Sequence, residues 1–464
     1  MVMYLPTDFE QYTRHLMGAE LYQTMTSALT NEPPVSIRLN PFKCRTDNVN
    51  IPLADGRVPW CDVGVYLRER PNFTFDPLMH AGAYYVQDAS SMFLHRVIRQ
   101  YVSDPVRMLD LCAAPGGKST CALAALPAGS VLFCNEPVRN RAQILRENIV
   151  KFGHPDVVVT NNYARDYQRS GLLFDVILAD VPCSGEGMFR KDAGAIAEWS
   201  PANVEHCRCL QREIVSDIWP CLKSGGLLIY STCTFNAREN EENAAWIAAE
   251  LGAEYLSVDV DPTWQITGSL VNDCPAYRFL PGKTRGEGFC LFVLRKTTNG
   301  FSPCKKRQIA RRKAVNCSLI NGLLQSGEYE VAQCADNEYL AIPRCWADTY
   351  YTVARSLHVV HAGIALGTQR GKDVVPAASL ALSTALDATY FPQVALDTEQ
   401  AIRFLRKEVV DLPAETPRGF VLLTYRGFAL GFEKNIGQRA NNLYPIEWKI
   451  KSSYIPQNNL NVIA

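Results

Sequence analysis

Five short apolar runs, each followed by a helical stretch, constrain the fold of this chain more than any other feature. The runs occupy residues 106–112, 131–136, 157–160, 175–180 and 225–233. Strands buried on both faces of a parallel sheet have this continuous apolar character, and their alternation with helices indicates repeated βαβ units. A later run, 288–295, is expected to be antiparallel at the far side of the sheet. We therefore predict an α/β protein with a doubly wound, Rossmann-like sheet.

The chain is too long for a single ordinary core, and its overall composition is that of a globular protein. It has 464 residues, with 47 Lys and Arg balanced by 47 Asp and Glu, so two to four domains are expected. The first residues lack the charged and apolar pattern of an export signal, and no apolar stretch reaches the length of a membrane span. The 16 cysteines are therefore expected to be free thiols in a reducing compartment, the cytoplasm. With seven histidines and no C-x-x-C pair, we expect no metal site.

Changes in pattern along the chain predict five segments. Residues 1–100 mix helical and turn-rich stretches and are expected to form an α+β lobe. Residues 101–297 carry the doubly wound sheet, and residues 298–315 are a linker with six Lys or Arg and no acidic residue. Residues 316–382 are an intermediate domain. Residues 383–464 are expected to form a compact α+β or small-barrel module with a helix at 398–407 and a tight turn at Arg426-Gly427.

The first turn of the sheet is built to approach a ligand closely. Residues 110–118 read Asp-Leu-Cys-Ala-Ala-Pro-Gly-Gly-Lys, so a strand ends, glycines follow and a helix begins. The next strand ends at Glu136, where a carboxylate can accept hydrogen bonds from ribose hydroxyls. Together these features indicate a nucleoside-type cofactor. The residues expected to bind it are Cys112, Ala113, Ala114, Pro115, Gly116, Gly117, Lys118, Glu136 and Asp180.

Two thiols follow neighbouring strands of the same sheet. Asp180-Val-Pro-Cys183 ends the fourth strand, and Ser231-Thr-Cys233-Thr ends the fifth. A single cysteine is more often a buried packing residue. Because the carboxyl ends of parallel strands meet at one edge, however, both thiols and the Asp180 carboxylate are expected to converge beside the cofactor.

These motifs resemble those of the RNA cytosine-5 methyltransferases of the RsmB/RsmF and NOP/NSUN group. Residues 110–118 resemble the cofactor motif of that family, residues 180–187 its substrate motif and residues 231–234 its nucleophile motif. The resemblance extends to residues 36–40 and 85–91. The run 186–191 and the carboxy-terminal extension are most similar to the RsmF branch, which methylates a cytosine near the decoding site of small-subunit ribosomal RNA.

The resemblance implies a role for each of the three catalytic candidates, with S-adenosylmethionine as the cofactor. Cys233 supplies a thiolate that adds to carbon 6 of cytosine, so that carbon 5 becomes nucleophilic. Asp180 holds or protonates ring nitrogen 3, and Cys183 assists the final elimination. Lys118 has two interpretations, a charge that lowers a thiol pKa or a solvated lysine at a helix start.

Two parts of the resemblance are less direct. Many relatives carry an Asp after the third strand that meets the adenine edge, whereas here Asn162 or Tyr163 stands near that place. Arg38 and Asn40 lie in the lobe that lines the RNA groove in the family; the alternative is that they are buried structural residues. The module at 383–464 resembles the PUA-like RNA-binding domain of RsmF-type enzymes, on Arg426-Gly and the run 442–445.

The sequence thus predicts an S-adenosylmethionine-dependent cytosine-5 methyltransferase of 16S ribosomal RNA. Its expected partner is ribosomal RNA, within a small-subunit particle, and it is expected to act as a monomer without binding DNA or a membrane. A transfer-RNA cytosine-5 methyltransferase and an RNA-binding ribosome assembly factor are the alternatives.

Overall fold

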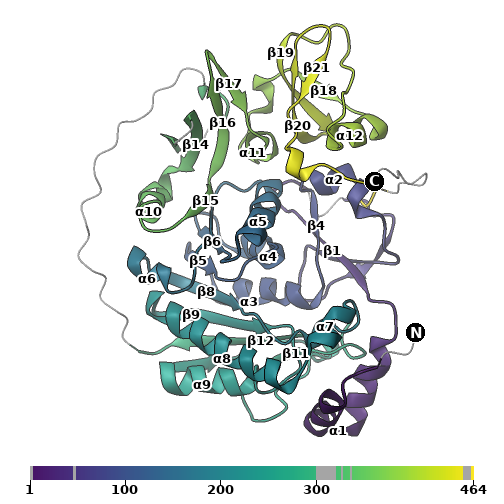
Figure 1. Ribbon diagram of the computed structural model, residues 1–464, viewed down its shortest axis with the longest axis vertical. Coiled ribbons are helices and arrows are strands. Elements are labelled where there is room, and N and C mark those ends of the chain that lie inside the picture. The colour runs from purple at the N-terminus through teal and green to yellow at the C-terminus, as the bar shows by residue number, and fades with distance from the viewer. Residues whose placement is uncertain (1–3, 45–48, 299–319, 326–327, 335–336, 453–460) are drawn as a thin grey trace.

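The computed structural model describes residues 4–44, 49–298, 320–325, 328–334, 337–452 and 461–464. The central element is a sheet of nine strands, with helices on both faces and three smaller sheets around it (Figure 1). The predicted linker at 298–315, with its basic run, lies almost entirely outside the described residues. No helix in the described ranges is long and apolar enough to cross a membrane.

The amino-terminal lobe is a long helix followed by a four-stranded sheet in the order β2-β3-β1-β4. The helix, α1 (Thr7–Leu29), is interrupted at Gly18, which has a φ of 75°. Its Phe9 ring packs edge-on against Phe189 at 5.1 Å and Trp199 at 5.6 Å, near the substrate motif. The other elements are β1 (Val35–Leu39), β2 (Ala54–Arg57), β3 (Gly64–Leu67), η1 (Phe73–Phe75), α2 (Pro77–His80) and β4 (Tyr84–Val86).

The five predicted strands of the central sheet are all present, and they are parallel to one another. The sheet has the order β10-β12-β9-β8-β5-β6-β7-β15, with β11 paired to β12. The chain winds outward from β5 in one direction and then returns to β8 beside it, so the switch point lies between β5 and β8. The strands are β5 (Arg107–Asp110), β6 (Val131–Asn135), β7 (Val157–Thr160), β8 (Phe174–Asp180), β9 (Leu222–Thr232), β10 (Ala253–Leu256), β11 (Tyr277–Phe279) and β12 (Phe289–Lys296).

The late strand β12 is antiparallel to β9, as predicted. Within a strand, successive side chains face two different cores: Val176 and Leu178 belong to one, Ile177 and Ala179 to the other. Burial on both faces explains why these strands read as unbroken apolar runs. The helices around the sheet are α3 (Phe93–Tyr101), α4 (Gly117–Ala125), α5 (Arg139–Phe152), α6 (Asp166–Ser170), α7 (Ala193–Glu198), α8 (Pro201–Ile218), η4 (Trp219–Cys221) and α9 (Glu241–Leu251).

Two helices, α7 and α8, occupy the segment between β8 and β9. The chain breaks at Trp199, which is extended, and Ser200 then caps α8 by accepting a hydrogen bond from the Asn203 amide at 3.1 Å. A serine followed by proline at the first helical position is a helix-start signal, so the residues themselves encode the break.

The intermediate domain contributes a strand to the central sheet, a feature that the sequence pattern did not predict. Its own sheet has the order β13-β14-β16-β17, and β15 (Val359–Ala362) instead pairs antiparallel with β7. This pairing covers what would otherwise be an exposed sheet edge. The domain comprises β13 (Tyr329–Gln333), β14 (Glu338–Pro343), α10 (Ala347–Val353), β16 (Ile364–Arg370), β17 (Asp373–Pro376) and α11 (Ala378–Leu382).

The carboxy-terminal module is a four-stranded sheet with one capped helix. The predicted tight turn is present: Arg426 and Gly427 have φ values of 49° and 82°, as a two-residue hairpin turn of type I′ requires. The predicted helix ends at Leu405, two residues early, and Lys407 is left-handed. The elements are β18 (Gln393–Ala395), α12 (Thr398–Leu405), β19 (Gly419–Tyr425), β20 (Phe428–Asn435) and β21 (Ala440–Asn442).

This module packs on the lobe and on α5, at the top of Figure 1. The Tyr444 hydroxyl lies 3.4 Å from His80 Nδ1, and the Val462 amide donates to Asp76 Oδ2 at 3.0 Å. The Lys151 ammonium of α5 lies 5.7 Å from the centre of the Trp448 ring. The module is therefore fixed beside the junction of the lobe and the central sheet domain.

A buried ion pair under the substrate loops gives the first prediction. Arg278 and Glu241 are 1% and 0% exposed, and Arg278 also donates to the Phe235 carbonyl oxygen at 2.9 Å. Arg278→Met leaves a buried carboxylate without its partner, so the free energy of unfolding should fall by about 3–5 kcal/mol. Urea titration followed by circular dichroism measures it.

The matched control is Arg285→Met, which breaks an ion pair with Asp55 whose side chains are 43% and 46% exposed. Its cost should stay below about 1 kcal/mol. Equal costs for the two variants would contradict the assignment of the Arg278 pair as a structural anchor.

Candidate active site

The two thiols singled out by the sequence meet at the carboxyl edge of the central sheet. Parallel pairing aligns Asp180 of β8 with Ser231 of β9, so the loops after the two strands start at the same level. Cys183 Sγ and Cys233 Sγ lie 3.1 Å apart, and both side chains are half-buried. The Cys233 amide also donates to Cys183 Sγ at 3.3 Å. The structure therefore brings together the residues that the sequence placed on separate strands.

The contact between the thiols makes them unequal. A hydrogen bond donated by the Cys183 thiol lowers the pKa of Cys233, and the same bond raises the pKa of Cys183 well above its ordinary value. The positive charge of Lys118 also lowers the pKa of Cys233. Cys233 is therefore the thiol that ionises first, with Cys183 as its hydrogen-bond donor.

Asp180 is held on both carboxylate oxygens. Its Oδ1 accepts from the Ser231 hydroxyl at 2.7 Å, and its Oδ2 accepts from Lys118 Nζ at 2.9 Å. The Asp180 side chain remains 27% exposed and Lys118 22%, so the carboxylate is fixed but reachable. Of the two interpretations of Lys118, a charge acting on the site fits this contact; a solvated helix-start lysine does not.

The turn at residues 112–118 is shaped by its neighbours on α5. Gly116 has a φ of 114°, which favours glycine, and α4 starts at Gly117. Asn148 donates to the Pro115 carbonyl oxygen at 2.8 Å and Arg141 to that of Ala114 at 3.2 Å. These bonds keep the backbone of the turn at the strand tips.

The residues at the tips of β5 and β6 fit a nucleoside cofactor. Glu136 is 1% exposed; its Oε1 accepts from the Val138 amide at 2.9 Å. Its Oε2 has no hydrogen-bond partner among the described residues, only Arg141 at 3.5 Å. Buried carboxylate oxygens are rarely left unsatisfied, so a hydroxyl donor such as a ribose fits there. Burial raises the pKa of the neighbouring Asp110 to about 7, and its Oδ1 likewise lacks a partner in the described ranges.

Asn135 forms hydrogen bonds that connect the carboxyl ends of β5, β6 and β7. The sequence analysis did not identify this residue. Its amide nitrogen donates to the carbonyl oxygens of Leu111 at 3.0 Å and Asn162 at 2.9 Å. Its carbonyl oxygen accepts from the Thr160 hydroxyl at 3.0 Å and the Asn162 amide at 3.1 Å. A polar residue at the end of an otherwise apolar strand is the signal that could have identified it.

Of the two candidates for the adenine edge, Asn162 is already engaged. Its side chain exchanges hydrogen bonds with the backbone of His358, at 3.2 Å to the carbonyl oxygen and 3.1 Å from the amide. Tyr163 is 61% exposed, with Arg165 lying 5.2 Å from its ring centre. Tyr163 is therefore the better placed of the two.

The RNA-groove interpretation of Arg38 and Asn40 was wrong, because both side chains are buried. Arg38 is 0% exposed and donates to Gln87 at 2.9 Å and to Thr120 at 2.6 Å. Asn40 is 1% exposed and donates to the carbonyl oxygens of Gly82 and Phe152, both at 2.8 Å. They join the lobe to the central sheet domain instead.

Two buried carboxylates behind the thiol loops were also missed. Glu186 accepts from Trp199 Nε1 and from the Phe235 amide, both at 2.9 Å. Glu239 accepts from the Ser184 amide at 3.0 Å and from Gln211 at 2.8 Å. Burial raises the pKa of Glu239 to about 7. Glu186 lies in the loop of Cys183 and binds the backbone of the loop of Cys233. Glu239 lies in the loop of Cys233 and binds the backbone of the loop of Cys183. The two carboxylates therefore position the thiol pair.

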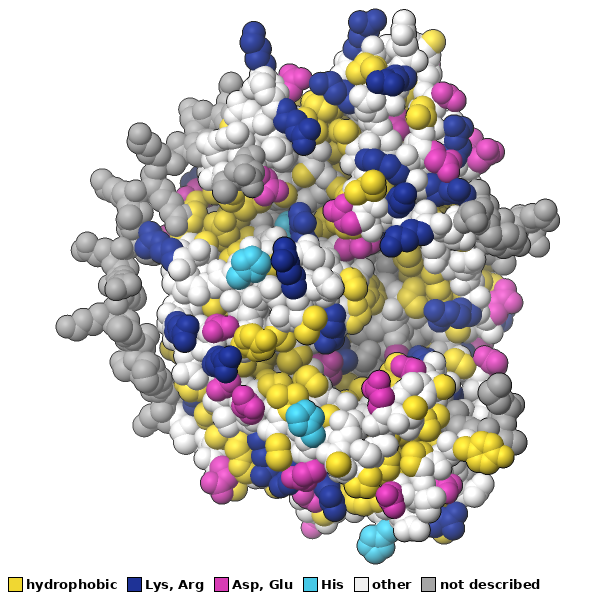
Figure 2. Space-filling model, viewed as in Figure 1, with side chains coloured by type: hydrophobic (Ala, Val, Ile, Leu, Met, Phe, Trp, Pro, Cys, Tyr) yellow, Lys and Arg dark blue, Asp and Glu magenta, His cyan; other side chains and the backbone are white. Residues whose placement is uncertain are grey.

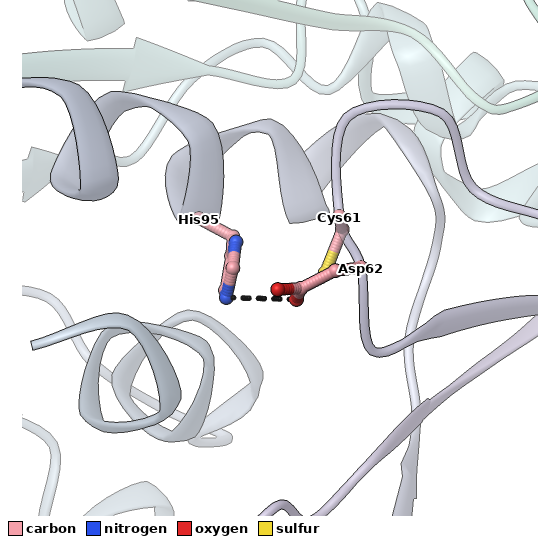
Figure 3. A group of neighbouring side chains, drawn as sticks. All are labelled: Cys61, Asp62 and His95. Atoms are coloured by element: carbon pink, nitrogen blue, oxygen red, sulfur yellow. Dashed lines mark ion pairs between the residues drawn. The ribbon is translucent and has the colours of Figure 1, made fainter. Parts of the chain in front are cut away.

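One further group of possible ligand atoms lies in the lobe, between α3 and the loop before β3. Figure 3 shows Cys61, Asp62 and His95, whose ligand atoms lie within 4.8 Å of one another. Burial raises the pKa of Cys61 and lowers that of His95 to about 4, and nearby arginines add positive charge. The contact that the structure shows within this group is between His95 Nε2 and Asp62 Oδ1, at 3.3 Å.

Three protein families match successive parts of the chain. Residues 101–295 match 16S rRNA methyltransferase RsmB/F, residues 5–89 the N-terminal domain of 16S rRNA methyltransferase RsmF, and residues 391–450 the methyltransferase RsmF PUA domain.

Similar proteins span nearly the whole length. Ribosomal RNA small subunit methyltransferase F of Enterobacter sp. (strain 638) is 28% identical over 471 residues, and that of Klebsiella pneumoniae (strain 342) over 474 residues; each alignment covers 96% of both chains. Among solved structures, NSun6 from Pyrococcus horikoshii with SFG has a TM-score of 0.54 and 20% identity, covering 64% of this chain and 100% of that one. The structural likeness shows the methyltransferase fold.

The charge of Lys118 gives the second prediction. Lys118→Gln removes the ammonium beside Cys233, so the pKa of this thiol should rise. Alkylation by iodoacetamide as a function of pH, read at the Cys233 peptide by mass spectrometry, should shift to higher pH. Lys223→Gln is the control, because Lys223 pairs with Asp175 at 2.6 Å near the start of β9, at the opposite end of this strand from Cys233. A shift shared by both variants would contradict a local effect of Lys118 on the Cys233 thiol.

Glu239 gives the third prediction, a pH dependence of stability. Its pKa is raised to about 7 in the folded protein, above about 4.3 in an unfolded chain. The folded state then binds more protons, so its contribution is present below about pH 4.3 and is lost as pH rises through 7. Glu239→Gln should flatten the decline of the urea midpoint between these pH values. An unchanged decline would contradict the raised pKa.

Proposed function

This chain belongs to the RsmB/F family of S-adenosylmethionine-dependent 16S rRNA methyltransferases, and from that premise we propose that it methylates carbon 5 of a cytosine in small-subunit ribosomal RNA. The observation that carries the proposal is the 3.1 Å contact between Cys183 and Cys233 beside the anchored Asp180 carboxylate. A methyltransferase acting on a nucleophilic nitrogen or oxygen has no need of a thiol pair at its substrate edge.

Carbon 5 of cytosine needs activation because it is a poor nucleophile. When a thiolate adds to carbon 6, a bond forms between sulfur and carbon 6, and the electron pair of the ring double bond becomes available at carbon 5. After methylation the proton leaves carbon 5, the sulfur–carbon bond breaks and the thiolate is regenerated. The site must therefore both form a thiolate and release it.

The three catalytic candidates fit these needs. Cys233 is the nucleophile, because hydrogen bonding from Cys183 and the charge of Lys118 lower its pKa. Asp180 holds or protonates ring nitrogen 3, where negative charge develops during the addition. Cys183 assists the elimination, since its thiol donates to the sulfur that must depart.

The cofactor is assigned to the tips of β5 and β6. The turn of residues 112–118 holds it through the backbone, Glu136 accepts from the ribose hydroxyls and Asp180 faces the reacting end. S-adenosylmethionine, when bound, supplies the methyl group that carbon 5 takes. Tyr163 covers the adenine in place of the missing carboxylate.

RNA is held by the carboxy-terminal PUA domain together with the lobe. The substrate cytosine must leave its stack to expose carbon 6, at a cost of a few kcal/mol that surrounding contacts offset. We propose that the enzyme acts as a monomer on an assembling small-subunit particle in the cytoplasm. The relatives named for the small subunit favour ribosomal over transfer RNA, and bisulfite sequencing of both RNAs from a deletion strain distinguishes them.

The two thiols give the fourth prediction, because their losses should differ. Cys233→Ala should abolish methylation, by at least about 10³-fold, and abolish any covalent RNA adduct. Cys183→Ala should let the adduct form and persist as a slowly migrating band on a denaturing gel.

Cys207→Ala is the matched control, since this buried cysteine of α8 lies outside the thiol pair. A persistent band that requires Cys183 would reverse the assignment. Growth rescue by Cys233→Ala without methyl transfer would favour the assembly-factor alternative.

A further inference from the structure

A cavity of about 210 Å³ lies outside the active site, between β4 of the lobe and helix α5. Tyr85 and Val86 line it on the lobe side, and Asn148, Lys151 and Phe152 on the α5 side. None of these residues has a role in the chemistry proposed above. The volume is enough for one planar heterocycle, and the cavity opens to the surface.

The cavity lies between the RNA-binding domain and the catalytic residues. At one end the Tyr85 ring packs on Gly117, with Cε1 3.2 Å from where a Cβ on that glycine would lie; the next residue, Lys118, holds Asp180. At the other end Lys151 lies under Trp448 of the PUA domain, 5.7 Å from its ring centre. Figure 2 shows this face of the molecule hollowed between the C-terminal domain and the central sheet domain. The cavity therefore adjoins both the PUA domain and the turn that carries Lys118.

The lining has the chemistry of a base-binding pocket. The rings of Tyr85 and Phe152 offer aromatic surface, and Met79 and Val86 add apolar contact. The Tyr85 hydroxyl makes no hydrogen bond to any described residue. Asn148 uses its amide nitrogen on Pro115, which leaves its carbonyl oxygen as an acceptor. Aromatic side chains bind single-stranded RNA by stacking on unpaired bases, whereas polar groups at the pocket edge orient them.

We propose that this cavity binds one unstacked base of the RNA substrate, a neighbour of the target cytosine, by stacking against Tyr85. The inference rests on the proposed function, because the ligand is a base of the same RNA. Holding a second base outside the stack fixes the RNA strand on both sides of the flipped cytosine. Stacking of this second base on an aromatic ring offsets part of the cost of flipping the cytosine.

The test compares three variants at the pocket with one outside it. Tyr85→Ala removes the stacking surface, Tyr85→Phe keeps it, and Val86→Trp fills the cavity from the adjacent position. Val260→Ala is the control, since Val260 is 39% exposed and follows β10 at the far edge of the central sheet. Thermal unfolding confirms that each variant is folded, and calorimetry measures its affinity for S-adenosylmethionine.

The readouts are the affinity for in vitro transcribed small-subunit rRNA and the KM and kcat for its methylation. Tyr85→Ala and Val86→Trp should raise the RNA Kd and KM roughly tenfold, with cofactor affinity and kcat at saturating RNA within about twofold. Tyr85→Phe and Val260→Ala should behave as the unchanged protein. Unchanged RNA affinity in both Tyr85→Ala and Val86→Trp overturns the proposal. A loss of cofactor affinity in Tyr85→Ala also overturns the proposal, because Tyr85 would then act by supporting the glycine turn that binds the cofactor.

A second arm identifies the base. Oligonucleotides around the methylated position, each lacking one base, are bound to the unchanged protein and to Tyr85→Ala. One abasic position should weaken binding to the unchanged protein roughly tenfold and have no effect on Tyr85→Ala, because both changes remove one contact. Additive effects at every position overturn the pocket assignment. Absence of a Cys233 adduct between the unchanged protein and RNA containing 5-fluorocytidine would instead contradict the proposed function, and the binding arms would still test the pocket.

Discussion

The parallel pairing of β8 with β9 is the constraint on which the active site depends. It aligns Asp180 with Ser231, so that a hydroxyl of one strand end holds the carboxylate of the other at 2.7 Å. The two loops then leave the sheet at one level and deliver their thiols to a common point. A register shift of one residue would turn these side chains to the opposite face of the sheet and separate the thiols.

Buried ionisable side chains near the loops after β8 and β9 support this strand pairing. Glu239 reaches from the loop of Cys233 to the backbone of the loop of Cys183, and Glu186 reaches the other way to the Phe235 amide. Arg278, which pairs with Glu241, donates a hydrogen bond to the carbonyl oxygen of the same Phe235. Each loop is thus hydrogen-bonded to the other through a buried carboxylate. These bonds fix the two loops relative to each other and keep the two thiols in contact.

Sequence patterns predicted the parts of the structure that local chemistry determines. The strands of the central sheet are apolar because both faces are buried, and the residues at their ends identify the edge where ligands bind. The convergence of Asp180, Cys183 and Cys233 at this edge was predicted in this way and is confirmed. The hairpin at Arg426-Gly427 was predicted because few dipeptides suit its left-handed conformations.

What the sequence could not predict depends on contacts between distant segments. Arg38 and Asn40 are polar residues in a strand, and only the packing of the lobe on the central sheet domain shows that they are buried. The docking of β15 on β7, which engages Asn162, is a pairing between residues about 200 positions apart, and no local pattern encodes it. Glu239 stands two residues before α9, and no local pattern encodes its contact with the Ser184 amide.

The most direct test of the account is the identity of the cysteine that bonds to the base. Small-subunit rRNA containing 5-fluorocytidine cannot lose a proton from carbon 5, so the covalent complex with the unchanged protein should accumulate. Tandem mass spectrometry of the nuclease-digested complex should find the nucleotide on Cys233, with Cys183 free. A nucleotide on Cys183, or no cysteine adduct at all, would contradict the account.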